Sequence, residues 1–498
     1  MQRNGHHHVI RPDAIGFNVG TNGYDATLDT TRRRRVATKL YNEADFLIRR
    51  ERAKLLSSTR DLQRNFAVFA WAVRKHLDYV STFTLQFRHK DTALNADMEA
   101  FIEEQSLPQN FESRGLLSRV MFTRLMESHR SVDGDCGSLK LDRGLVQGIE
   151  GDRIAKPTGE VPRAVADRLK DFNDDGLLIR DNRIVEFCVC KRNRAKLDFE
   201  AIIPAEWLRL HGYFYRFDQW RGTSPLAAAV NTFRDCYEGL ELALAKLKVS
   251  QYFALAIYRE MGGEQLGAVN PAGSEGGEGE PSEEEAAQTK YDVDFGQGAV
   301  LLDLDPGDRA EFLDSSTPSM EAQSFTNLEL ALGLKALDIP FSFYDEAHTN
   351  YSGARQAWIQ YEQSADWKRS DNKLFLDDWT QWKLGIGIAR GQVTLPRSIK
   401  PEELDWEWIP TAVPWIDPLS EVQADLAAID GGLETRTSVI RRRTARSFRD
   451  VLAELKVEKD EARAAGVVFS GVNENLVTQA IANRAAQPQQ PKQPSGSK

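Results

Sequence analysis

The sequence predicts an α+β fold that is predominantly helical, and three observations support this prediction. Apolar residues recur at steps of three or four over 41–85, 224–258 and 353–386, a spacing typical of helices. Between 133 and 215, alternating apolar and polar residues are separated by turn-forming residues, which indicates strands. A chain of 498 residues is too long for a single hydrophobic core, so we expect several structural regions.

Composition and charge narrow the class of protein. Apolar residues make up 41% of the chain and charged residues 28%, which is typical of a folded protein. The net charge of −10 disfavours tight binding to phosphate backbones, and four cysteines are too few for a disulfide framework. No apolar run approaches the roughly 18 residues of a membrane span, so we expect no membrane contact and no export signal.

The first half of the chain begins with an expected tethering arm over 1–40, which lacks hydrophobic periodicity. From Tyr41 to about Leu85 we expect one helix with one buried face, and shorter helices at about 94–105 and 113–130. The segments 133–141 and 144–152 are predicted strands. In 184–192, alternate residues are apolar on both faces, so we expect a strand covered on both sides. The apolar residues of the first helix are Leu62, Phe66, Phe69, Val73, Leu77 and Val80.

The segment 224–258 is predicted to form one long helix. Ser224 is placed to cap it and Pro225 occupies its first turn. Its apolar residues follow an uninterrupted 4-3-4-3-4-3 spacing, typical of helices that pack side by side. Periodicity alone favours equally an ordinary core helix and lateral packing against other helices. The stripe consists of Leu226, Val230, Phe233, Tyr237, Leu240, Leu244 and Leu247.

The second half alternates between polar loops and helices. Residues 261–288 contain seven Gly and seven Glu but no Lys or Arg, which predicts a flexible acidic loop. Two short strands around a Pro-Gly turn are expected in 299–314, followed by helices at 318–337, 353–386 and 417–455. The residues 485–498 are expected to form a disordered tail.

Several motifs could carry chemistry, but for each a structural interpretation is favoured or equally good. The segment 171–182 resembles a calcium loop, yet Asn182 replaces the bidentate carboxylate at the last position, so we favour a polar turn. Cys188 and Cys190 lack a second pair at zinc spacing. Gly385–Gly391 lack the strand-turn-helix context of a phosphate loop, and Tyr344–His348 lack a nucleophile. His6–His8 are interpreted as a polar tract. Arg32–Arg35 suit a solvated tether and an acidic or nucleic-acid partner equally well.

Six stretches in co-linear order resemble the lambda-like portal protein family of tailed bacteriophages. They include STRDLQRNFAVFAWAV before the first strands and FDQWRGTSPLA at the start of the long helix. The resemblance runs from Tyr24 to about Val468, although the acidic loop 261–288 and the polybasic segment 440–446 are not part of the pattern. The six stretches are 23–35, 58–73, 130–154, 202–227, 337–358 and 415–435.

The resemblance implies a structural protein with no catalytic residue, cofactor or metal. It implies a ring of twelve identical subunits at the portal vertex of the virion, assembled in the host cytoplasm, through which double-stranded DNA is packaged and ejected. The implied partners are the terminase large subunit, a head completion or tail connector protein, and the major capsid protein. An acidic chain is compatible with weak, non-specific contact with DNA, because sliding requires weak binding.

The resemblance also assigns regions of a portal fold. These are a wing at 41–223, a first stem helix at 224–258, a clip at 259–316 and a second stem helix at 318–337. A tunnel loop at 338–352, a wing or tunnel helix at 353–416 and a crown at 417–484 follow. The stripe of 224–258 becomes the expected subunit contact of the stem. The expected channel residues are Phe341, Phe343, Tyr344, Asp345, Glu346, His348 and Asn350.

Two other functions are weighed against this reading. A minor capsid or adaptor protein that binds a portal would be expected to lack the RG-x-SPL helix followed by a tunnel-loop region. A magnesium-dependent nuclease would need clustered carboxylates, for which Asp303, Asp305 and Asp308 are the best candidates. The spacing of these three residues suits a Pro-Gly hairpin equally well.

Overall fold

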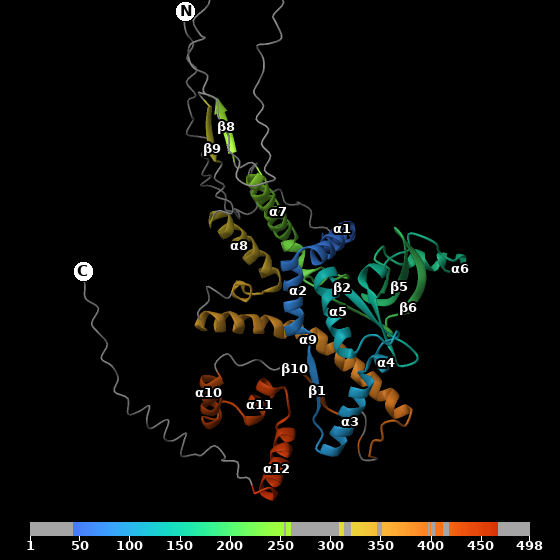
Figure 1. The fold of residues 1–498 in the computed structure, drawn as a ribbon. Helices are drawn as coiled ribbons and strands as arrows, with labels where there is room; N and C mark the ends of the chain where they lie inside the picture. Colours follow the sequence, from blue (N-terminus) through green and yellow to red (C-terminus); the bar gives the residue numbers. More distant parts are fainter. Residues whose placement is uncertain are drawn as a thin grey trace, which may run out of the picture.

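A computed structural model describes residues 43–252, 255–259, 308–312, 320–345, 351–396, 399, 404–411 and 418–466. The expected arm 1–40, acidic loop 261–288 and tail 485–498 lie outside these residues. The described chain mixes helices with four small sheets, which confirms the α+β prediction (Figure 1). In the described residues, no helix is both long enough and apolar enough to cross a membrane.

The N-terminal helical region is two helices rather than one. α1 (Glu43–Asn65) and α2 (Ala67–Val80) are separated by Phe66, whose backbone is extended, with φ −110° and ψ 108°. A strand, β1 (Phe83–Phe87), replaces the expected end of the helix. All six predicted apolar side chains are nevertheless buried, because the break preserves their common face.

Three helices follow, and local capping fixes two of their starts. Asp91 accepts hydrogen bonds from the backbone of Ala93 and Leu94 at the start of α3 (Thr92–Gln105). The short α4 (Pro108–Phe111) leads to α5 (Arg119–Asp133), which Ser118 caps. α5 ends at Gly134, whose φ of 96° favours glycine and whose added Cβ would lie 2.7 Å from the Gly222 carbonyl oxygen.

Two three-stranded antiparallel sheets follow. β2 (Asp135–Lys140) lies between β3 (Val146–Glu150) and β7 (Leu208–Gly212). β5 (Arg183–Asn193) lies between β4 (Leu177–Arg180) and β6 (Lys196–Pro204). Both faces of β5 are covered, as predicted, because Phe187 and Val189 enter one apolar cluster and Cys188 and Cys190 another.

The segment that resembles a calcium loop forms two turns. The Asn173 side chain accepts a hydrogen bond from the backbone of Leu177 at 2.8 Å, where β4 begins. Asp181 and Asn182 form the two-residue turn between β4 and β5, with φ of 49° and 58°. The polar-turn interpretation is therefore confirmed. All four cysteines are buried free thiols in the structure.

The predicted long helix is shorter than expected. A 3₁₀ turn over Pro225–Ala229 leads into α7 (Val230–Tyr252), and Leu255–Arg259 form the strand β8. β8 pairs antiparallel with β9 (Asp308–Phe312). The chain returns in α8 (Met320–Leu334), which packs on α7 and extends by a 3₁₀ turn over Lys335–Leu337. α7, α8 and the β8–β9 pair project together from the rest of the molecule (Figure 1).

The longest element is α9 (Tyr351–Ala389), which spans 39 residues and crosses beneath α2 (Figure 1). Its buried Phe375 and Trp379 join an apolar cluster with α3, α5 and β1, as their helical spacing predicts. The glycines 385–391 lie in the last turns of α9 and the turn after it, rather than in a phosphate loop. β10 (Trp406–Pro410) then pairs with β1.

Three helices end the described chain. They are α10 (Pro418–Asp430), α11 (Arg436–Thr444) and α12 (Phe448–Ala464). The predicted helical region 417–455 is confirmed, although turns divide it and it continues to 464. These helices lie on the opposite side of α9 from α7 and α8 (Figure 1).

Candidate functional site

The start of α7 is anchored deep in the molecule. The Ser224 hydroxyl accepts a hydrogen bond from the backbone of Leu226 at 3.1 Å and donates one to the Ser131 carbonyl at 2.6 Å. Leu226, Val230 and Phe233 are buried against α1, α2 and α8. This half of the predicted stripe is therefore an ordinary core face of the chain itself.

α8 is held against α7 at a close contact. A Cβ on Gly333 would lie 2.8 Å from the Phe233 ring, so only glycine allows this approach. Leu330 and Leu334 on the same side of α8 are buried in the same cluster. The two helices therefore form one antiparallel pair at the end next to the core.

The far half of this helix pair exposes apolar side chains. On α7, Leu240 and Leu244 are 45% and 51% exposed, while Tyr237 and Leu247 are half-buried. On α8, a second face at helical spacing is more than half exposed, and it consists of Phe325, Leu328 and Leu332. Apolar side chains that gather exposed on neighbouring helices are typical of an interaction surface.

The segment after α8 starts at a residue that α9 holds by hydrogen bonds. Asp338 adopts a left-handed backbone with φ 61°, and its carboxylate accepts hydrogen bonds from Ser364 at 2.5 Å and Lys368 at 2.8 Å. Burial alone would raise the pKa of Asp338, but these hydrogen bonds lower it. Lys368 also donates to the Leu337 carbonyl at 3.0 Å, so α9 fixes the position where the segment begins.

The two phenylalanines of this segment pack against the rest of the chain rather than project from it. The ring of Phe343 lies 6.0 Å from Tyr79 on α2 and 5.4 Å from Tyr361 on α9. Phe341 is half-buried, and its ring lies 5.6 Å from Tyr344. Tyr344 is 42% exposed. Glu346, His348 and Asn350 lie outside the described residues.

A buried charge network lies where α2, α5 and α9 meet. The Glu127 carboxylate accepts hydrogen bonds from Arg130 at 2.6 Å, from the Tyr213 hydroxyl at 2.6 Å and from Asn372 at 3.1 Å. Burial alone would raise the pKa of Glu127, but Arg130 and the hydrogen bond with His76 lower it to about 2. Burial lowers the pKa of His76, against the opposing effect of its hydrogen bond with Glu127.

A second buried network surrounds the residues just before α7. Arg221 is 1% exposed and donates to both oxygens of Asp135 at 2.8 Å. It also donates to the carbonyls of Ile154, Asp175 and Gly151 at 2.6, 3.0 and 2.7 Å. In the sequence, the signal was the Arg-Gly pair that Thr223 separates from the capping Ser224. Only the fold shows that Arg221 holds the sheets to the start of α7.

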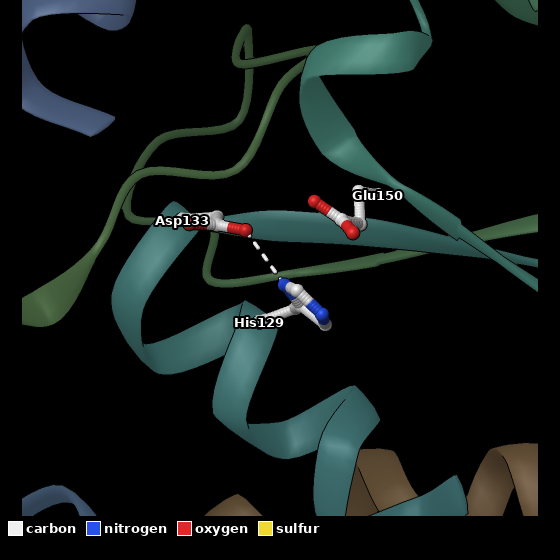
Figure 2. Close-up of side chains that lie close together, drawn as sticks. All are labelled: His129, Asp133 and Glu150. Atoms are coloured by element: carbon white, nitrogen blue, oxygen red, sulfur yellow. Dashed lines mark hydrogen bonds and ion pairs between the residues drawn. The ribbon is translucent and has the colours of Figure 1, made fainter. Parts of the chain in front are cut away.

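One cluster has the composition of a metal site. His129, Asp133 and Glu150 place one ligand atom each within 4.8 Å of one another (Figure 2). His129 is already hydrogen-bonded to Asp133 at 2.7 Å, and Arg60 donates to both oxygens of Asp133, at 2.8 and 2.7 Å. A second guanidinium, Arg192, pairs with Glu150. A cation would have to displace these arginines, so the cluster is interpreted as a structural ion-pair network.

The polybasic segment 440–446 is also engaged within the chain. Arg443 contacts Glu421 at 2.5 Å and Asp425 at 2.8 Å, while Arg442 contacts Asp425 at 2.9 Å. Arg441 pairs with Glu407 at 3.0 Å and Arg446 with Glu454 at 2.5 Å. These arginines hold α10, α11 and α12 together and join α11 to β10.

The carboxylates proposed for a nuclease are not assembled in the described chain. Asp303 and Asp305 lie outside the described residues, and Asp308 begins the strand β9. The basic cluster Arg32–Arg35 also lies outside them.

A family model matches the larger part of the chain. Residues 30–368, more than half of the chain, match the family described as "Phage portal protein, lambda family". No curated protein matches the sequence. The stretch 415–435, included in the resemblance above, lies beyond the matched residues.

Three solved structures share a partial likeness. A chain from the neck of an empty gene transfer agent (GTA) particle, computed with C6 symmetry, is 13% identical and has a TM-score of 0.46. That match covers 77% of this chain and 92% of the other. Chains from the C12 neck of the native particle and from its virion are each 14% identical with TM-scores of 0.42. The neck match covers 80% of this chain and the virion match covers 78%, and each match covers 92% of the other chain.

Proposed function

Because this chain belongs to the lambda family of phage portal proteins, we propose that twelve copies form a ring at one capsid vertex, through which double-stranded DNA is packaged and ejected. The role of this family is structural rather than enzymatic, so neither a nuclease nor an adaptor that binds a portal describes the chain. Under this proposal the working part is the opening along the ring axis rather than a reactive side chain.

The observation that carries the proposal is the exposed apolar surface of α7 and α8. Leu240 and Leu244 on α7, together with Phe325, Leu328 and Leu332 on α8, are 45–60% exposed. Covering such faces contributes about 25 cal/mol for each Å² removed from water. Neighbouring copies in a ring would cover them on both sides of each helix pair. We therefore assign the stem to α7 and α8 and the clip to the β8–β9 end.

The segment between α8 and α9 is the proposed tunnel loop. Since Phe341 and Phe343 pack against α2 and α9, we propose that they anchor this loop. The residues proposed to face DNA are then Tyr344, Asp345, Glu346, His348 and Asn350. An acidic chain repeated around the axis would repel phosphate, which favours sliding over tight binding.

The remaining parts of the proposal concern partners and location. The wing is assigned to the sheets and helices of 41–223 with α9, and the crown to α10–α12. The ring would sit at the portal vertex of the virion after assembly in the host cytoplasm. It would bind the terminase large subunit during packaging, then a head completion or tail connector protein, and the major capsid protein around its rim.

Mass measurement and electron microscopy of the purified protein test the proposal. The chain mass is 56.1 kDa, so we expect a species near twelve times this mass, with a central opening in every particle viewed along its axis. A monomer that persists at micromolar concentration, or closed particles without an opening, would overturn the ring.

A further inference from the structure

The helix α10 has its polar and apolar faces reversed relative to an ordinary surface helix. Glu421 and Asp425, one turn apart, are only 5% and 9% exposed because Arg442 and Arg443 of α11 bind them. Leu419 and Leu426 on the opposite face are 71% and 43% exposed. The ion pairs therefore hold α10 with its leucines facing outward.

The outward face of α10 has coiled-coil spacing. Its apolar residues follow a 3-4-3 pattern that places them on one stripe, which we call the α10 strip. Leu419 and Leu426 are exposed and the other two are half-buried. Charged side chains are absent from this face until Asp430, at the last residue of the helix. The α10 strip consists of Leu419, Val422, Leu426 and Ile429.

A second apolar surface lies on α12. Leu452 and Leu455, three residues apart, are 53% and 44% exposed and share one side of this helix. We call them the α12 pair. Between 418 and 466, Ala462 is the only apolar side chain that is buried in the described chain. These three helices therefore stay together through ion pairs and leave their leucines available.

We infer that the α10 strip of one copy packs against the α12 pair of the adjacent copy, so that a second belt of subunit contacts lies at the α10–α12 end of the ring. This inference rests on the proposed ring. In a cyclic ring, one surface of each copy binds a different surface of the next copy. Both surfaces are therefore exposed to solvent in a single isolated copy. The α10 strip and the α12 pair meet this condition, because both are exposed in one chain and do not cover each other.

The chemistry of the α10 strip fits this contact. An uncharged strip can be covered without burying an unpaired charge, which would cost several kcal/mol. Glu421 and Asp425 are already paired with Arg442 and Arg443 on the other face of α10. The adjacent copy thus meets only apolar and small polar side chains along the first three turns of α10.

Cysteine crosslinking of the assembled full-length protein tests the inference. The four native cysteines are buried, so thiols introduced at exposed positions are the reactive ones. In the double variant Leu426→Cys, Leu452→Cys, a short bismaleimide should join the α10 of one copy to the α12 of the next. We expect a ladder of covalent multimers on a denaturing gel. Each single variant should give only the band of the uncrosslinked chain.

Each other outcome has a definite meaning. If the double variant forms rings but the crosslinker joins the two introduced cysteines of the same chain, the two surfaces meet inside one copy and the inference is wrong. Rings with no crosslink at all, or a dimer from a single variant, also overturn it while leaving the portal function intact. Failure of the unmodified protein to form rings would instead contradict the proposed function.

A charge substitution supplies a second readout. Leu426→Asp should lower the temperature at which rings dissociate by several degrees, because the new carboxylate would be buried between copies. Ala424→Asp adds the same charge on the same helix, but away from the α10 strip, and should leave this temperature unchanged. Equal dissociation temperatures for the two variants would overturn the inference.

Discussion

Arg221 makes five hydrogen bonds while almost completely buried, and it is the residue whose loss should be most costly. Its guanidinium binds both oxygens of Asp135 and three backbone carbonyls that come from different segments. Arg52 contacts the same carboxylate at 2.5 Å. The fixed, planar fork of arginine suits this arrangement, and lysine cannot reproduce it.

We therefore expect Arg221→Met to lower the free energy of unfolding by ~3–5 kcal/mol, since it leaves Asp135 buried without its main partner. Urea denaturation followed by circular dichroism measures this quantity. The exposed Arg180 at the end of β4 is a matched control, and Arg180→Met should change stability by less than about 0.5 kcal/mol. Equal effects of the two substitutions would contradict the role given to Arg221.

The buried carboxylates also predict how stability depends on pH. The pKa values of Glu127 and Asp135 are lowered to about 2 from ordinary values of 4.5 and 3.8. A carboxylate with a depressed pKa in the folded state stabilises the protein above its unfolded pKa and loses that contribution as the pH falls. We expect the free energy of unfolding to decrease steeply between about pH 4.5 and 2.

Denaturation at a series of pH values checks this, with Glu127→Gln as the test. That variant should be less stable at pH 7 and should show a shallower decrease below pH 4.5. Asp142→Asn, at an exposed turn, should follow the unmodified protein. An unchanged acid slope in Glu127→Gln would show that this network does not control acid stability.

At the scale of elements, the contact between α7 and α8 depends on Gly333. Gly333→Val would push the Phe233 ring out of its position, and overpacking of this kind costs ~1–3 kcal/mol. Gly239 on α7 is the matched control because an added Cβ would meet nothing within 4 Å. Gly239→Ala should stabilise the helix by ~0.5–1 kcal/mol. Thermal unfolding of both variants measures the two opposite shifts.

The proposed tunnel loop yields a prediction that separates anchoring from channel residues. Phe343→Ala removes ring contacts with Tyr79 and Tyr361 and should lower the unfolding temperature. Tyr344→Ala, at a 42% exposed position with ring contacts to Phe341 and Trp71, should lower that temperature less than Phe343→Ala does and should also alter the amount of DNA retained in assembled particles. If Tyr344→Ala destabilises the protein as much as Phe343→Ala does, the division of roles is wrong.

At the scale of the whole molecule, ring assembly should depend on the outer half of the α7 stripe. Leu240→Asp, Leu244→Asp places charge where a neighbouring copy would pack, at several kcal/mol per site, and should abolish rings. Both leucines are about half exposed in one chain, so the monomer should still fold. Leu240→Met, Leu244→Met keeps the surface apolar and should form rings. Mass photometry separates the two, and normal rings from the Asp variant would exclude these residues from the stem contact.

Periodicity predicted most of the helices and which residues share an apolar face. The resemblance assigned the whole α7 stripe to contacts between copies, whereas Leu226, Val230 and Phe233 pack in the core of the chain itself. Periodicity could not predict where helices break. Phe66 and Tyr252 stand within segments whose spacing is helical throughout, yet α1 ends just before one and α7 ends at the other. Local preferences there are weak, and packing against distant segments decides the backbone.

The sequence by itself determined the fold class, the order of segments and the family, because each depends on local patterns along the chain. Only the tertiary structure decided which half of a uniform apolar stripe is core and which is surface. It also decided that Phe341 and Phe343 pack inward, that the arginines of 440–446 pair within the chain, and that the leucines of α10 face outward. These outcomes depend on which groups, far apart in sequence, meet in space, and periodicity along one helix contains no information about its partner.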